Sequence, residues 1–178
     1  VGGSFTSLQP DSPLVVGGAF NSIGGVASRN LALLGDDGSV SSIFQPNPNG
    51  AVTALLVQAD GKLVVAGAFT NISGATRNRI ARFNPDYTLD TAFNPNANGN
   101  VGGLALQPDG KILLTGGFTS VGGQVRLALA RINADGSVDT GFSPSGQILA
   151  ASPAVQADGK IIVTGVEGGG PPSLLRYN

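Results

Sequence analysis

The hydrophobic and polar positions of the chain repeat with a fixed period. A polar turn, Gln107–Lys111, precedes an apolar run, Ile112–Phe118, that includes a glycine pair. The glutamine that opens this turn recurs every 49 residues, at Gln9, Gln58, Gln107 and Gln156. A period of roughly 20–50 residues is typical of repeat architectures. The sequence therefore predicts an array of similar units, with bounds 1–49, 50–98, 99–147 and an incomplete 148–178.

Each unit is expected to form four short strands. In the second unit the apolar and β-branched runs predict strands at Val52–Val57, Lys62–Phe69, Arg79–Phe83 and Leu89–Phe93. Asp60-Gly61 between the first two strands favours a tight hairpin turn, because both residues tolerate positive φ. The run Leu63–Ala66 is apolar at consecutive positions, so both faces of this strand should be covered by other layers.

Antiparallel four-stranded units of this length, apolar on both faces, fit the blades of a β-propeller. The expected fold is all-β, with residues 1–178 forming a single propeller segment. Another β-repeat array and a β-sandwich are the alternatives. A sandwich would show alternating inward and outward positions and no strict 49-residue period.

The fourth unit departs from the pattern. It keeps the strand Ile161–Gly165 but reaches Asn178 within its third strand. Known propellers use about 4–8 blades, and three full units plus an incomplete one would not close a ring easily. We therefore expect either a segment of a longer propeller-forming chain or self-association through the terminal blades.

The segment Gln107–Phe142, which reads QPDGKILLTGGF…ALARINADGSVDTGF, resembles the delta-60 repeat of large bacterial surface and secreted proteins. That repeat is treated as a β-propeller repeat of unknown function. The glycine pair at the end of the second strand also resembles kelch blades, although the kelch tryptophan is absent. The resemblance covers essentially the whole chain. It implies an extracellular or cell-surface setting and a scaffold or recognition role, and it brings no catalytic residues.

Composition narrows the function. Hydrophobic residues make up 41% and charged residues 12% of the chain, as in folded proteins. A net charge of −1 without a Lys/Arg cluster argues against nucleic acid as a partner. No apolar run reaches the ~20 residues that a membrane-spanning helix needs. Histidine and cysteine are both absent, which removes the commonest general base and thiolate chemistry. We therefore expect no enzyme and predict no catalytic, cofactor-binding or metal residues.

Two short acidic segments, Asp86–Asp90 and Asp135–Asp139, carry carboxylates at the spacing of a calcium loop. A hairpin turn followed by a sheet-edge charge is the competing interpretation. Ca²⁺ takes about six to eight oxygen ligands, and two carboxylates supply too few. Calcium is thus the one cofactor left open. The glycine pair Gly116-Gly117 lacks the Lys-Ser/Thr of a phosphate loop, and it favours a close backbone approach or a bulge.

Arginine and aspartate recur together across the third and fourth strands. Arg82 and Arg131 are each followed eight residues later by an aspartate, Asp90 or Asp139. At the matching positions of the first unit stand Leu33 and Ser41, so both charges vanish together. This pattern predicts cross-strand ion pairs with a structural role.

The loops between the second and third strands are the candidate recognition surface. Loops on one face of a repeat protein often bind partners, although Asn, Ser and Thr are also ordinary turn formers. The residues selected as recognition candidates are Asn21, Asn71, Arg77, Thr119 and Arg126.

The predicted function is a non-enzymatic scaffold or protein-interaction module of a secreted or cell-surface bacterial protein. Its partner would be another protein or further blades of the same chain. A glycan-binding adhesin is one alternative, weakened by the scarcity of aromatic residues that stack on sugars. A hydrolase or cofactor enzyme is the other, and it would need an Asp/Glu pair in a shared pocket.

Overall fold

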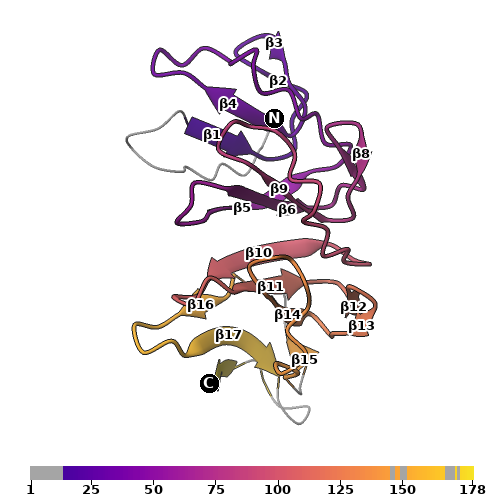
Figure 1. Ribbon diagram of the computed structural model, residues 1–178, viewed down its shortest axis with the longest axis vertical. Helices are drawn as coiled ribbons and strands as arrows, with labels where there is room; N and C mark the ends of the chain where they lie inside the picture. The colour runs from indigo at the N-terminus through magenta and orange to yellow at the C-terminus, as the bar shows by residue number, and fades with distance from the viewer. Residues whose placement is uncertain (1–13, 145–146, 149–151, 167–170, 172) are drawn as a thin grey trace.

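The chain is built from β-strands throughout its described part. The computed structural model describes residues 14–144, 147–148, 152–166, 171 and 173–178. These residues form 18 strands with antiparallel pairing, and none of their segments is a helix that could cross a membrane. Figure 1 shows the sheets following one another along the long axis in chain order. The predicted all-β propeller architecture is confirmed.

The second and third units contain matching three-stranded antiparallel sheets. Their strands are β5 (Val52–Val57), β6 (Leu63–Gly67) and β9 (Ile80–Phe83), then β10 (Val101–Leu106), β11 (Ile112–Gly116) and β14 (Leu129–Ile132). The order is β5-β6-β9 and β10-β11-β14, so the middle strand of each sheet pairs on both sides.

The first and fourth units follow the same plan less completely. Their strands are β1 (Leu14–Gly17) and β4 (Leu31–Leu34), then β15 (Gln147–Ile148), β16 (Ala154–Val155), β17 (Ile161–Val166) and β18 (Ser173–Tyr177). β1 pairs with β4, and β17 pairs with all three other strands of its unit. The first copy of the repeated turn, at Gln9, lies outside the described residues.

The loops between the second and third long strands contain small hairpins that the sequence pattern did not predict. They are β2 (Ser22–Ile23) with β3 (Val26–Ala27), β7 (Asn71–Ile72) with β8 (Ala75–Thr76), and β12 (Ser120–Val121) with β13 (Gln124–Val125). In each hairpin two consecutive positive-φ residues make the turn, for example Ser73 at 53° and Gly74 at 74°. This is the type I′ geometry that suits hairpins. Strands of two residues are too short to show a period.

The predicted fourth strand is reduced to one bridge per unit. Leu89 bridges to Phe83, and Val138 bridges to Ile132 in the same way. The N–H of Asp90 still donates to the Arg82 carbonyl, at 2.8 Å. The Asp90 carboxylate then accepts the N–H of Ala92 at 3.1 Å, which turns the backbone out of the ladder. The blades are therefore three-stranded sheets with a bridged outer segment.

Both faces of the middle strands are buried, as predicted. In β6, Leu63 and Val65 pack against the first unit, whereas Val64 and Ala66 pack against the third. All four side chains are buried. Because neighbouring positions of a strand face opposite sides, this continuous apolar run holds three units together.

The first strands of neighbouring units lie close together. The Thr53 hydroxyl on β5 donates to the Val101 carbonyl on β10 at 2.6 Å. Gly17 at the end of β1 allows this approach, because a Cβ there would lie 2.5 Å from the Val52 side chain of the next unit. Within the second unit, a Cβ on Gly67 would clash with the Ala51 carbonyl oxygen. The register shift between Val52 and Ala54 is a bulge at the same place. Of the glycine pair singled out in the sequence, Gly116 confirms the predicted close backbone approach, because a Cβ there would clash with the Asn100 carbonyl oxygen, whereas nothing lies within 4 Å of a Cβ at Gly117.

The residue before the third strand has a left-handed backbone in three units. Asn30, Arg79 and Ala128 occupy the same repeat position, with φ of 59°, 70° and 60°. Asparagine tolerates this conformation, and the Asn30 side chain also bonds the Phe20 N–H at 3.2 Å and the Pro48 carbonyl at 2.9 Å. Ala128 adopts the same strained backbone conformation without such hydrogen bonds from its side chain.

Substitutions at this position should have opposite effects in two units. We expect Ala128→Asn to raise the free energy of unfolding by about 0.5–1 kcal/mol, because asparagine is less strained there. Asn30→Ala should lower it by about 1–3 kcal/mol, since it adds strain and removes two hydrogen bonds. Urea unfolding of both variants measures the effects. Changes of the same sign would contradict the interpretation.

Candidate functional site

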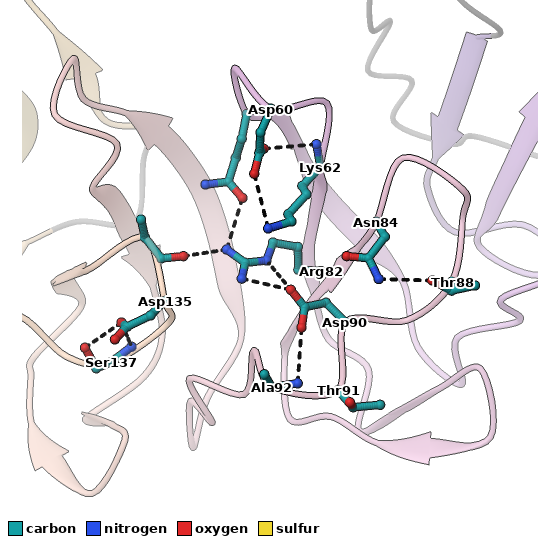
Figure 2. A network of polar contacts seen from close by, with 12 residues as sticks. Asp60, Lys62, Arg82, Asn84, Thr88, Asp90, Thr91, Ala92, Asp135 and Ser137 are labelled. Carbon is teal, nitrogen blue, oxygen red and sulfur yellow. Dashed lines mark hydrogen bonds and ion pairs between the residues drawn. The ribbon is translucent and has the colours of Figure 1, made fainter.

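Arg82 joins the second and third units. Its Nε and Nη2 donate to Asp90 Oδ2 at 3.0 and 2.9 Å. Its Nη1 donates to Gln58 Oε1 at 3.2 Å and to the Ala134 carbonyl of the next unit at 2.5 Å. Figure 2 shows Arg82 between Asp90 on one side and the turn that carries Asp135 on the other. The predicted cross-strand pair is confirmed.

The environment of Arg82 is mostly closed to solvent. The guanidinium carbon lies 4.1 Å from the centre of the Phe93 ring, in cation–π geometry. The Arg82 and Asp90 side chains are only 7% and 14% exposed. A buried charge is tolerated when its donors are satisfied, and here a carboxylate, an amide and a carbonyl satisfy them. This arrangement supports a structural role.

The third unit contains a looser version of the same contact. Arg131 Nε donates to Asp139 Oδ2 at 2.8 Å, and Lys111 Nζ donates to the same oxygen at 3.0 Å. Arg131 also lies over the Phe142 ring, 4.4 Å from its centre. The second predicted pair is thus confirmed, with a lysine partner that sequence reasoning missed. In the first unit Leu33 packs in an apolar cluster instead.

The paired aspartates are held in their ionised form. Burial acts to raise the pKa of Asp90, but the hydrogen bonds and charge of Arg82 outweigh it and hold the pKa below its usual value. The hydrogen bond from Lys111 lowers the pKa of Asp139, burial opposes it, and Arg131 adds to the lowering. Groups with lowered pKa values carry charge at neutral pH and are poorly suited to donate protons.

The acidic segments considered for calcium are used in turns. Asp135 accepts the Ser137 hydroxyl at 2.6 Å and the Ser137 N–H at 2.8 Å, which lowers the pKa of its carboxyl. Asp86 and Thr88 repeat this contact. Within the described ranges, no three His, Cys, Asp or Glu side chains come together as metal ligands would. The hairpin interpretation thus accounts for these residues.

Arg77 and Arg126, two of the predicted recognition residues, directly follow the small hairpins β7–β8 and β12–β13. Arg77 donates to the Thr76 carbonyl at 2.9 Å and to the Thr91 carbonyl at 3.0 Å. Arg126 contacts the carbonyls of Val125 and Asp139 in the same way. Both arginines are buried, with 9% and 8% of their surface exposed. They clamp each hairpin to the outer segment of its own unit.

The other predicted residues lie on the hairpin loops. The Thr119 hydroxyl accepts from Asn98 Nδ2 at 2.8 Å, while Asn98 Oδ1 accepts the Thr119 and Ser120 N–H groups at 2.9 Å. Asn49, the last residue of the first unit, makes the same contacts with the loop of the second unit, including one to the Asn71 N–H at 2.9 Å. Asn71 is half-buried and Asn21 is exposed. The 49-residue spacing of Asn49 and Asn98 was the missed signal.

Three of the five large apolar side chains that are exposed in the described part of the chain lie on or beside these hairpins, and Ile43 and Leu174 lie elsewhere. Val26 is 48% exposed on β3, Val125 is 73% exposed on β13, and Leu127 just after β13 is 59% exposed. Figure 1 shows β8, β12 and β13 along one side of the molecule. We call the three hairpins β2–β3, β7–β8 and β12–β13, together with Leu127, the hairpin edge. Sequence reasoning chose its polar residues and missed its apolar ones.

A cavity of about 400 Å³ lies at the opposite end of the long strands. The repeated turns of the second and third units line it, with Gln58, Leu106, Gln107 and Ala134 among the lining residues. Burial acts to raise the pKa of the Asp60 carboxyl at its rim, but the hydrogen bonds and charge of Lys62 outweigh it and lower the pKa. The Asp60 carboxyl therefore stays ionised at neutral pH, beside a cavity of the size that small ligands occupy.

The sequence of the repeat matches a known family. The family model described as "Domain of unknown function (DUF5122) beta-propeller" matches residues 9–40, 58–93 and 107–142, which is more than half of the chain. The chain belongs to the DUF5122 β-propeller family. This match supports a propeller repeat of unknown function, whereas the delta-60 and kelch names stay at the level of resemblance. A comparison with curated proteins gave no match.

Solved structures share the fold of this DUF5122 chain. One is titled as a streptogramin B lyase structure, with 15% identity, a TM-score of 0.59, and coverage of 98% of this chain and 53% of that one. Another is virginiamycin B lyase from Staphylococcus aureus, with 14% identity, a TM-score of 0.59, and coverage of 97% and 55%. The DUF5122 chain spans about half the length of these structures. At such identity the likeness shows the fold alone.

The expectation that the chain is not an enzyme needs correction. Both solved structures of the same fold are named as lyases, so this fold does support enzymes. The expectation relied on the absence of histidine and cysteine, which removes particular catalytic groups but not others. Function depends on the site that a fold carries, and the fold itself is compatible with catalysis.

The two arginine contacts should differ in their effect on stability. We expect Arg82→Leu to lower the free energy of unfolding by about 3 kcal/mol, because it leaves Asp90, Gln58 and the Ala134 carbonyl without their donor. Arg131→Leu should cost only about 1 kcal/mol, since Asp139 keeps Lys111. Urea unfolding measures both. As a control, the double variant Arg82→Leu with Asp90→Ser copies the first unit and should recover part of the lost stability. Equal losses of stability for Arg82→Leu and Arg131→Leu would contradict the interpretation.

Stability should also depend on pH through Asp90. The pKa of Asp90 is lower in the folded protein than in the unfolded chain. Its contribution to the free energy of unfolding is therefore fully present above the pKa of the unfolded chain, about 4. This contribution is lost as the pH falls through the pKa that Asp90 has in the folded protein. The stability difference between wild type and Asp90→Asn should therefore be larger at pH 7 than at pH 3, as measured by urea unfolding. A constant difference across this range would contradict the assignment.

Proposed function

We propose that this chain is a scaffold and protein-interaction module of a secreted or cell-surface protein, and that its hairpin edge contacts the partner. The observation that carries the proposal is the exposure of Val26, Val125 and Leu127 on or beside the hairpins. Val125 and Leu127 lie two residues apart, and exposed apolar side chains that neighbour one another favour a protein interface. The setting outside the cell is supported by the resemblance to surface-protein repeats and by the Asn-, Ser- and Thr-rich linkers.

The rigid support of the hairpins strengthens the proposal. Arg77 and Arg126 fix two hairpins to their outer segments, and Asn49 and Asn98 tie the loop starts to the linkers between units. A surface that is already ordered loses less conformational entropy when it binds. The hairpin edge therefore combines apolar contact area with a fixed shape.

A glycan-binding role has less support. Sugar rings stack on exposed aromatic side chains. Every phenylalanine in the described part of the chain is buried, and Tyr87 and Tyr177 are only partly exposed. A glycan array tests this alternative directly.

The proposal predicts that a partner can be cross-linked at the hairpin edge. We would place a photo-reactive amino acid at Val125 and, as a control, at Ala157, an exposed residue in a turn at the other end of the strands. Illumination of cells that produce the protein should give a discrete adduct from position 125 and none from position 157. Mass spectrometry identifies the partner.

A second variant separates binding from folding. Val125→Ser with Leu127→Ser should weaken binding of the purified partner by about tenfold or more, as interface residues do, while the melting temperature changes little because both side chains are exposed. Equal adducts from both cross-linking positions, or unchanged affinity in the double variant, would rule out the hairpin edge as the binding surface.

A further inference from the structure

The repeated glutamines differ in one respect that the proposed function does not explain. Gln58 Oε1 accepts a hydrogen bond from Arg82. Gln107 Oε1 and Gln156 Oε1 stand at the same repeat position and are buried, yet neither has a hydrogen-bond partner among the described residues. The Gln107 amide nitrogen donates to the Gly159 carbonyl at 3.4 Å, so only its oxygen is unsatisfied. A buried acceptor without a donor is costly, so these two oxygens mark places where a donor is missing.

The missing contact at Gln107 follows from comparison with Arg82. The turn of the next unit reaches Arg82, and its Ala134 carbonyl holds Nη1 beside Gln58. Arg131 has the corresponding aspartate and phenylalanine in its own unit, Asp139 and Phe142, but within the described residues its hydrogen bonds reach only Asp139. The Arg131 Nη groups and Gln107 Oε1 thus lack a third group, a carbonyl acceptor like that of Ala134, which would hold Nη1 beside the glutamine oxygen.

Strand register identifies that third group. Ile161 pairs with Tyr177, just as Leu63 pairs with Phe83 and Ile112 pairs with Ile132. Asn178 therefore stands where Asn84 and Asn133 open the turns of the second and third units. In the third unit the carbonyl that reaches Arg82 belongs to the residue directly after this asparagine.

The aromatic ring beside the arginine restricts the shape of the turn. Gly136 lies against the Phe93 ring, and a Cβ at this glycine would be 2.8 Å from a ring carbon. Its φ of 92° also favours glycine. We call the contact between two neighbouring units at the position of Arg82 a seam. At the seam between the first and second units, where Leu33 replaces the arginine, the same turn position holds Tyr87, whose ring lies 5.2 Å from that of Phe44. An arginine seam therefore takes a turn with glycine at its fourth position.

We propose that Arg131, Gln107 and Phe142 form a docking site for a turn of the type Asn-x-Asp-Gly that enters from the position of Asn178. The carbonyl of residue x accepts from Arg131 Nη1, which then also reaches Gln107 Oε1, and the glycine lies on the Phe142 ring. The occupant is chemically the turn that residues 133–136 form on Arg82. This site concerns the contact between units and is independent of the hairpin edge.

The test extends the chain after Asn178 with a copy of residues 134–142. We expect the melting temperature to rise by about 3–8 °C, because new contacts worth a few hydrogen bonds shift a protein of this size by that amount. In the Arg131→Leu background the rise should be lost. In the Arg82→Leu background it should persist, since that variant weakens a different seam. An extension with valine in place of the glycine corresponding to Gly136 should give no rise.

Three outcomes would overturn the proposal. One is an equal rise with and without Arg131, and another is no rise in any background. The third is a rise that depends on protein concentration and accompanies a dimer in light scattering, because the turn would then bind a second copy. If the extended chain does not fold, calorimetric titration of the original chain with the peptide of residues 133–142 replaces it. Binding that Arg131→Leu weakens at least tenfold supports the site, and no binding overturns it.

Discussion

Each sheet of this protein is apolar on both faces, and every other feature depends on covering those faces. Leu63 and Val65 contact one neighbouring unit while Val64 and Ala66 contact the other. A sheet of this kind exposes a large apolar surface when it stands alone, so burial between units provides the main favourable free energy of folding. The fixed repeat length follows, because each unit must present the same pattern to the next. Glycines such as Gly17, where a Cβ would lie 2.5 Å from the Val52 side chain of the next unit, then let neighbouring units approach closely enough.

Polar seams add selectivity to this apolar stacking. The Arg82 guanidinium is buried between two units and has its charge matched by Asp90 and its remaining donors matched by Gln58 and Ala134. Where the sequence has Leu33 instead, the seam is apolar and the next turn carries Tyr87. Because a buried donor without an acceptor is costly, an arginine seam is more stable when the next unit supplies a carbonyl, as Ala134 does for Arg82. Arginine and leucine seams thus distinguish one neighbouring unit from another.

The two ends of the strands have different characters. At one end the hairpins expose valine and leucine and are followed by buried arginines that bind the outer segments, which suits contact with a protein. At the other end the repeated turns line a cavity beside Asp60 and the Arg82 network. The solved lyases with this fold show that a propeller of this type also supports chemistry, so binding surface and catalytic scaffold are both compatible with the architecture.

The sequence alone determined the repeat, the long strands and the Arg–Asp pairs, because period, apolar runs and paired replacement at Leu33 and Ser41 are local or strictly periodic signals. It did not determine the hairpins, whose strands are two residues long. Nor did it determine the loss of the fourth strand, which accompanies the capture of a backbone N–H by the side chain of Ser41, Asp90 or Asp139. Nor could it show that Arg77 lies buried while Val125 is exposed. Burial depends on which segments stack, and only the tertiary structure brings the Ala134 carbonyl, from the next unit, to Arg82.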